Sequence, residues 1–202
     1  MFDFKNKVAV VTGGARGIGK VICEAFRKAG AQVCTIDLLD NDFFVGDLGD
    51  KAALETFAQT VIDRYGKVDF LINNAAPNMV GISEASYEDF EYALKVGVTA
   101  PFYLAKLFRP HFGEGASIVN ISSSRAHMSQ PETESYTAAK GGISALTHGL
   151  AMSLAGKVRV NAISPGCALA DVRQTYDSYG KTHIPYLSKL IARIIPYRSK
   201  AR

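Results

Sequence analysis

A short apolar segment near the amino terminus runs directly into a glycine-rich loop, and a helical pattern follows the loop at once. The apolar segment is residues 8–11, and the loop reads Thr-Gly-Gly-Ala-Arg-Gly-Ile-Gly over residues 12–19. Glycines at this spacing allow a tight turn and a close approach of the backbone to another group. A strand, a glycine loop and a helix in this order are typical of one unit of a parallel α/β sheet.

The rest of the chain repeats this alternation of short apolar runs and longer amphipathic segments. Most of the apolar runs are rich in Val and Ile, as in strands that helices cover on both faces. Gly30 and Gly66 follow two helical segments, where a left-handed cap is expected. We therefore expect an α/β fold: a Rossmann-like, doubly wound parallel sheet of six strands with helices on both faces. The expected strands are residues 8–11, 32–36, 43–45, 68–72, 117–121 and 158–163, and the expected helices are residues 21–28, 52–65, 87–108 and 136–154.

Length and composition favour a single domain. The chain has 202 residues, 48% of them hydrophobic, and no repeat or linker divides it. We expect residues 1–202 to form one domain that ends in an atypical basic tail over residues 167–202. No run of about 18 apolar residues and no signal-like segment occurs, so the sequence predicts a cytoplasmic protein without a membrane span.

The formal charge of +4 is concentrated near the carboxyl terminus. Residues 173–202 hold seven Lys or Arg and one Asp, so the preceding part is slightly acidic. A nucleic-acid partner is therefore not expected, and a weaker alternative makes the tail a docking arm for an acidic partner. Cys23, Cys34 and Cys167 are widely spaced, and the four histidines are scattered. This pattern predicts reduced thiols and no metal site.

The glycine loop and a later acid together indicate a dinucleotide site. The loop N–H groups and the positive end of the following helix suit a pyrophosphate. Asp37, at the end of the second expected strand, can accept hydrogen bonds from both hydroxyls of an adenosine ribose and repels a 2′-phosphate. Arg16 argues in the opposite direction, because a guanidinium pairs with phosphate. We give Asp37 the greater weight and expect NAD(H) to be preferred over NADP(H).

With later motifs, the TGxxxGxG loop resembles the short-chain dehydrogenase/reductase family over roughly residues 5–166. These motifs are Asp47-Leu48, Asn73-Asn74-Ala75-Ala76, Ser123 thirteen residues before Tyr136, Lys140 four residues after it, Asn161 and Pro165-Gly166. The resemblance implies an NAD(H)-dependent oxidoreductase of the short-chain alcohol dehydrogenase or ketoreductase type, acting on a small-molecule alcohol or carbonyl compound. It implies cofactor contacts from Gly13, Ala15, Arg16, Gly17, Ile18, Gly19, Asp37, Asp47, Leu48, Asn74, Ala75, Tyr136, Lys140, Pro165 and Gly166.

Ser123, Tyr136 and Lys140 are the expected catalytic residues. Residues four apart on a helix share a face, so Tyr136 and Lys140 can point into one cleft. A phenol is a poor base at neutral pH, and the Lys140 ammonium favours the phenolate, which lets Tyr136 act as general base or acid. Ser123 would bond the same substrate oxygen, although Ser122 and Ser124 beside it make this assignment depend on register.

Two departures from the family pattern leave a second function open. Gly97 stands where the family has an Asn in a kinked helix, and we expect the kink to survive because glycine tolerates irregular backbone. The proton relay is then expected to be altered. The substrate lid and seventh strand of the family have no counterpart in residues 167–202, which leaves the sixth strand at an open edge. The alternative is a cofactor-binding pseudoenzyme or interaction protein with an incomplete substrate pocket.

Assembly is also implied by the resemblance. Gly141 and Gly142 lie inside the last expected helix, where they predict close packing against another helix. The family pairs the helices after the fourth and fifth strands across a two-fold axis. We therefore expect a homodimer.

Overall fold

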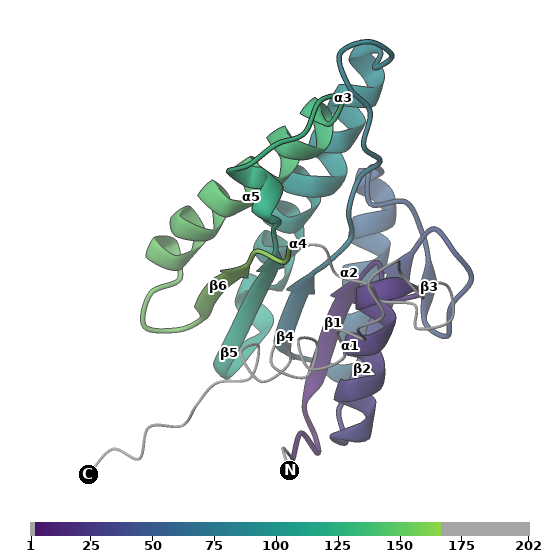
Figure 1. Cartoon of the computed structure of the whole chain (residues 1–202). Helices are drawn as coiled ribbons and strands as arrows, with labels where there is room; N and C mark the ends of the chain where they lie inside the picture. The colour runs from purple at the N-terminus through teal and green to yellow at the C-terminus, as the bar shows by residue number, and fades with distance from the viewer. Residues whose placement is uncertain (1–2, 167–202) are drawn as a thin grey trace, which may run out of the picture.

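Six parallel strands form one sheet in the order β3-β2-β1-β4-β5-β6 (Figure 1). The computed structural model describes residues 3–166, so the predictions for the tail, the lid, the seventh strand and Cys167 lie outside the described residues. The strand order reverses between β1 and β4, which confirms the doubly wound fold. The strands are β1 Val8–Thr12, β2 Gln32–Asp37, β3 Phe44–Val45, β4 Val68–Asn73, β5 Phe112–Ile121 and β6 Arg159–Ile163.

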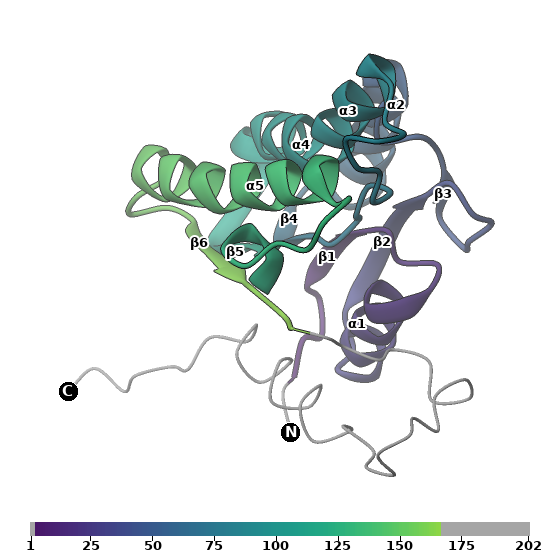
Figure 2. The same ribbon diagram turned by 45° about the horizontal axis from the view of Figure 1, so that its top comes forward.

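Helices cover both faces of the sheet (Figure 2). α1 lies on one face, and α2, α3, α4 and α5 lie on the other. No helix within residues 3–166 is long and apolar enough to cross a membrane. The helical segments are α1 Gly17–Lys28, α2 Lys51–Tyr65, α3 Tyr87–Leu94, the π-helix η1 Lys95–Thr99, α4 Ala100–Phe108, the 3-10 turns η2 Arg109–His111 and η3 Ser124–Ala126, and α5 Glu134–Ser153.

The alternation of side chains along β1 divides the core between the two faces. Val10 packs in the cluster that contains Phe57 of α2 and Leu104 of α4. Val11 points to the other face, in the cluster that contains Phe26 of α1. Because both faces are covered, every residue of β1 is buried, as its apolar sequence predicts.

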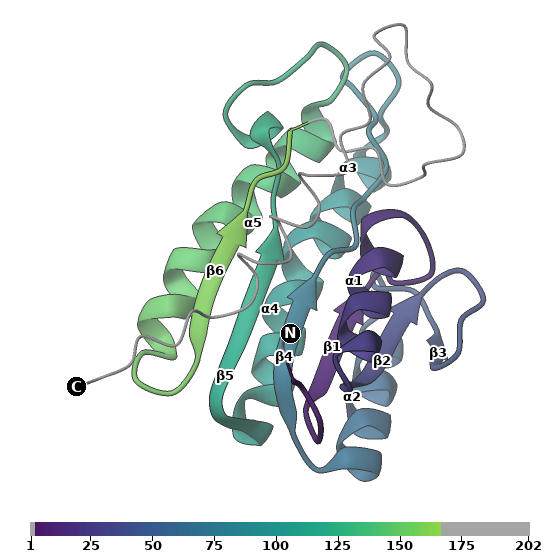
Figure 3. The ribbon, with the colours of Figure 1, turned by 60° about the horizontal axis from the view of Figure 1, so that its bottom comes forward.

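β5 begins five residues earlier than the sequence predicts. Its register against β4 shifts between the pairs Val68–Phe112 and Phe70–Ser117, so β5 carries extra residues in an irregular stretch. Gly115 in this stretch adopts a positive φ of 72°. At the far edge, β6 pairs with β5 and with no other strand of the described sheet (Figure 3).

The single helix expected over residues 87–108 is instead α3 and α4 joined by the π-helix η1. Gly97 lies at the centre of η1, which confirms that the irregular backbone survives without the family's Asn. A Cβ at Gly97 would lie 2.7 Å from the Ala139 Cβ of α5. The glycine therefore permits a close approach of η1 and α5.

A second glycine contributes to the same contact. A Cβ at Gly142 would lie 2.8 Å from Val98 Cγ2 of η1, so the predicted close packing is confirmed for Gly142. The prediction for Gly141 stays untested, since within the described chain a Cβ there meets no atom within 4 Å and no second copy is present.

We expect Gly97→Ala to destabilise the fold by about 1–3 kcal/mol, because the added Cβ overpacks the contact with Ala139. Ala139→Gly removes the opposing methyl group, so the double variant should lose less stability than the two single variants together. Urea denaturation of the four proteins measures this coupling. Gly141→Ala is the control, because it adds a methyl group on α5, the helix that Gly97 faces, where no atom of the described chain lies within 4 Å. Strictly additive losses would contradict the contact.

Candidate functional site

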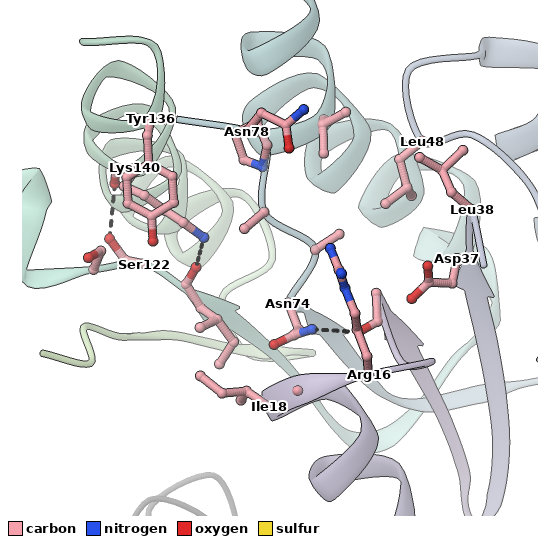
Figure 4. A pocket seen from close by; sticks show the side chains of 18 of the residues that line it. Arg16, Ile18, Asp37, Leu38, Leu48, Asn74, Asn78, Ser122, Tyr136 and Lys140 are labelled. Carbon is pink, nitrogen blue, oxygen red and sulfur yellow. Dashed lines mark hydrogen bonds between the residues drawn. The ribbon is translucent and has the colours of Figure 1, made fainter. Parts of the chain in front are cut away.

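A cavity of about 500 Å³ opens at the carboxyl ends of the strands, a size typical of small-molecule sites. It lies where the strand order reverses, and residues that directly follow β1 and β4 meet residues of β2, β5 and α5 in it (Figure 4). Of the predicted site residues, the cavity is lined by Gly13, Arg16, Gly17, Ile18, Asp37, Asp47, Leu48, Asn74, Ala75, Ser123, Tyr136, Lys140, Pro165 and Gly166. Ala15 and Gly19 do not line it.

Gly19 has a packing role instead. A Cβ at this position would lie 2.0 Å from the Gly13 carbonyl oxygen and 2.5 Å from Asn74 Nδ2. Gly13 itself adopts a positive φ of 66°. The glycines therefore let the loop fold back on the first turn of α1, and this leaves Gly13, Arg16 and Gly17 to line the cavity.

Hydrogen bonds from the end of β4 hold the glycine loop in place. Thr12 Oγ1 accepts from the backbone N–H groups of Asn74 and Ala75 at 3.0 and 3.1 Å. The Asn74 side-chain amide donates to the carbonyl oxygens of Thr12 and Gly13 at 3.0 and 2.9 Å. Thr12 is buried, and its role in joining the two strand ends was not predicted from the sequence.

Asp37 connects the end of β2 to the loop. Its Oδ2 accepts from the Ala15 N–H at 3.0 Å, and its Oδ1 accepts from the Leu39 N–H at 3.0 Å. Ala15, which does not line the cavity, therefore contributes to the site through its N–H, which holds the Asp37 carboxylate. Figure 4 shows Asp37 and Arg16 on the same side of the cavity, across from Tyr136 and Lys140.

Tyr136 and Lys140 lie one turn apart on α5, and both line the cavity. Lys140 is only 2% exposed, and its Nζ lies 5.5 Å from the centre of the Tyr136 ring. The ammonium donates to the Ile121 carbonyl oxygen at 2.6 Å. Burial lowers the pKa of Lys140 to about 8. A buried lysine whose pKa is lowered because its contacts do not fully replace the lost water is typical of a functional site.

The residue before Tyr136 fastens the start of α5 to the loop after β4. Ser135 Oγ donates to the Val80 carbonyl oxygen at 2.7 Å, and the Val80 N–H donates back to Ser135 Oγ at 3.1 Å. Ser135 is buried. These bonds set the position of the helix turn that carries the phenol.

The neighbouring serines after β5 have different surroundings. The Ser122 hydroxyl lies between the Lys140 carbonyl oxygen at 2.9 Å and Ser144 Oγ at 2.7 Å, so it is engaged with α5 (Figure 4). Ser123 Oγ accepts from the Arg125 N–H at 3.2 Å, and within residues 3–166 its hydroxyl proton is not donated to a protein acceptor. Both residues border the cavity. The geometry therefore favours Ser123 over Ser122 as a donor to a ligand.

Several lining residues were not selected from the sequence. Most come from loops and helix faces whose composition carries no motif, although Asn78 and Pro77 directly follow the recognised Asn-Asn-Ala-Ala segment. The additional lining residues are Leu38, Leu39, Gly46, Ala76, Pro77, Asn78, Tyr92, Val96, Ile121 and Ser122.

Comparison with known proteins decides the family. The sequence profile described as short chain dehydrogenase matches residues 7–179. The chain belongs to the short-chain dehydrogenase/reductase family. This confirms the family that the motifs of the sequence predict.

Relatives in this family are named oxidoreductases. An uncharacterized oxidoreductase of Thermotoga maritima is 37% identical over 182 residues, covering 80% of this chain and 71% of that protein. An L-fucose dehydrogenase of Rattus norvegicus is 36% identical over 179 residues, covering 81% of this chain and 66% of that protein. The chain thus spans about two thirds of the length of these curated relatives.

Solved structures of the short-chain dehydrogenase/reductase type share the fold. An apo SCOR enzyme from Clostridium thermocellum superposes with a TM-score of 0.79 at 42% identity, over 82% of this chain and 74% of that chain. A blue fluorescent protein from a metagenomic library, in complex with NADPH, gives a TM-score of 0.80 at 25% identity, over 88% and 81% of the two chains.

Lys140→Met should change how stability depends on pH. The folded pKa of Lys140, about 8, lies below the unfolded value of about 10.4. Between these values the unfolded chain binds more protons, so stability rises with pH in the wild type. Over this range, we expect the free energy of unfolding of the wild type to rise by about 3 kcal/mol relative to that of Lys140→Met. Urea denaturation from pH 7.5 to 10.5 measures the gain. Lys106→Met, at an exposed position, is the control. If the free energy of unfolding depends on pH in the same way for Lys140→Met and the wild type, the buried cation is contradicted.

Proposed function

We propose that this protein is an NAD(H)-dependent oxidoreductase that interconverts an alcohol and a carbonyl compound. The observation that carries the proposal is the shared cavity, in which the phenol of Tyr136 and the buried ammonium of Lys140 lie across from the glycine loop and Asp37. The relatives are named oxidoreductases and dehydrogenases, which supports the same activity.

The residues present fit a nicotinamide dinucleotide. Gly13 and Gly19 lie too close to neighbouring protein atoms to admit a Cβ, which allows the tight turn of the loop. The loop lies at the amino-terminal end of α1, where an anion is favoured. The cavity continues from this loop to Tyr136 and Lys140. The loop would hold the pyrophosphate, Asp37 the adenosine ribose, Asp47 and Leu48 the adenine, and Asn74, Ala75, Lys140, Pro165 and Gly166 the nicotinamide half.

Asp37 supports NAD(H) over NADP(H). Its carboxylate is fixed by two backbone N–H groups and remains at the cavity surface. A fixed negative charge near the ribose accepts hydroxyl hydrogens and repels a 2′-phosphate. The Arg16 guanidinium is exposed beside the same cavity, so its attraction for phosphate is screened by solvent more strongly.

The mechanism assigns one task to each of three side chains. When bound, the nicotinamide would accept a hydride from the alcohol carbon or donate one to the carbonyl carbon. Tyr136 takes the hydroxyl proton of the alcohol in one direction and returns it to the carbonyl oxygen in the other. Ser123 donates its free hydroxyl proton to the same substrate oxygen and orients it. Lys140, 5.5 Å from the Tyr136 ring centre, stabilises the phenolate.

A sugar or related polyol is the substrate class that we propose. Relatives of this chain are named L-fucose dehydrogenase, glucose and ribitol dehydrogenase, and probable galactose dehydrogenase, and one similar structure is an aldohexose dehydrogenase. Asn78, which lines the cavity beyond the recognised motif, offers an amide donor and acceptor to a hydroxylated ligand.

A homodimer is part of the proposal. α4 and α5 cover the same face of the sheet, and each presents an exposed large apolar side chain, Phe102 at 47% and Met152 at 79%. Burial of such residues against a second copy would stabilise a two-fold interface.

Titration with NADH and NADPH, followed by nucleotide fluorescence, tests the cofactor. We expect NADH to bind at least about tenfold more tightly than NADPH, a difference in binding free energy of about 1.4 kcal/mol. Asp37→Ser should remove most of that preference. Asp40→Ser is the matched control, because it removes a nearby exposed charge that does not line the cavity. Tighter binding of NADPH than NADH by the wild type would contradict the assignment.

Tyr136→Phe tests the chemistry. We expect kcat with NAD⁺ and the best of a panel of sugars, polyols and simple alcohols to fall by about 10²–10⁴-fold, because the proton acceptor is lost. NADH binding should change little. Tyr87→Phe, on the exposed start of α3, controls for loss of a phenol elsewhere. A wild type that binds NADH but turns over no member of the panel would favour the cofactor-binding pseudoenzyme, for which the Gly97 departure is the motivating observation.

A further inference from the structure

The carboxylate of Asp47 is held by a tyrosine from a distant part of the chain. Tyr92 lies on α3, and its hydroxyl donates to Asp47 Oδ1 at 2.8 Å. The Gly49 N–H donates to the same oxygen at 2.7 Å. Asp47 and Tyr92 both line the cavity, on the wall that also includes Leu48. Two donors therefore fix one oxygen of this acid at the cavity surface.

Close packing holds the tyrosine ring in this position. A Cβ at Gly49 would lie 2.5 Å from Tyr92 Cε2, so the half-buried ring lies directly against the Gly49 backbone. The ring also packs on the main apolar cluster of the protein. Burial first, and then the neighbouring Asp47, raises the pKa of Tyr92 to about 12. The hydroxyl therefore keeps its proton at neutral pH and can donate it to Asp47.

The arrangement leaves the second carboxylate oxygen to a ligand. Within residues 3–166, the hydrogen bonds to the Asp47 side chain end on Oδ1. Oδ2 can therefore accept a hydrogen bond from a group in the cavity. A carboxylate fixed before binding loses little rotational freedom when it meets a donor, so its discrimination between ligands is sharper than that of a mobile acid.

We propose that Tyr92 is a positioning residue that holds Asp47 as the acceptor for the exocyclic amine of an adenine ring. This inference rests on the proposed dinucleotide site. It assigns to Tyr92 the discrimination between an adenine, which presents an amine at this position, and a hypoxanthine, which presents a carbonyl oxygen and meets the carboxylate unfavourably.

The ratio of two dissociation constants tests the proposal. NADH and reduced nicotinamide hypoxanthine dinucleotide differ only at the base, where the C6 amine becomes a carbonyl oxygen and N1 gains a hydrogen. Both are titrated against the same protein sample by nucleotide fluorescence. We expect the wild type to prefer NADH by about tenfold, and Tyr92→Phe to reduce the preference by about three- to tenfold. A partly unfolded variant lowers the binding of both ligands equally, so the ratio reports only the adenine contact.

Tyr103→Phe is the matched control. Tyr103 on α4 also donates its hydroxyl to a carboxylate, Glu55 Oε1, but it does not line the cavity. This variant should leave the ratio unchanged. Asp47→Ala should abolish the preference, and Tyr92→Phe should have no further effect in that background, because Tyr92 acts only through Asp47.

Each outcome bears on a different step. An unchanged ratio in Tyr92→Phe, or an equal reduction in the Asp47→Ala background, would overturn the role of Tyr92. A wild type that binds both dinucleotides equally would also overturn it, while the proposed function would stand. A wild type that binds neither dinucleotide would overturn the proposed function together with this inference.

Discussion

The joint between the carboxyl ends of β1 and β4 is the constraint on which the site depends. Thr12 Oγ1 accepts from the two N–H groups that follow β4, and the Asn74 amide closes the joint by donating to the carbonyl oxygens of Thr12 and Gly13. The helices that follow β1 and β4 lie on opposite faces of the sheet, so the chain diverges at this point and leaves a crevice. The hydrogen bonds join the two strand ends at the base of the crevice, and Asp37 is bonded to the same loop through the Ala15 N–H.

On the other side of the crevice, small residues determine how close α5 comes. Gly97 lies against Ala139, and Gly142 lies against Val98, so η1 and α5 approach more closely than larger side chains would allow. This approach accompanies the burial of Lys140, whose ammonium bonds to a backbone carbonyl oxygen. Desolvation of that cation lowers the pKa of Lys140 to about 8, and the low polarity around it strengthens its electrostatic effect on the neighbouring phenol.

Most of the fold could be predicted because its signals are local. Unbroken runs of Val and Ile indicated the strands, and Gly30 and Gly66 marked helix ends, which they cap with positive φ. The errors occurred where local signals are ambiguous. The start of β5 contains Gly113 and Gly115, which weaken a strand pattern. The irregular pairing with β4 that makes this stretch a strand is a long-range contact.

The candidate site divides in the same way. The sequence by itself determined that Tyr136 and Lys140 share a helix face and that a glycine turn precedes α1, because residue spacing alone decides these relations. Only the tertiary structure decided that Ser122 bonds to α5 while Ser123 accepts from the Arg125 N–H, and that Tyr92 holds Asp47 across 45 residues of chain. Such pairs depend on how separately formed elements dock, and periodicity carries no information about that docking.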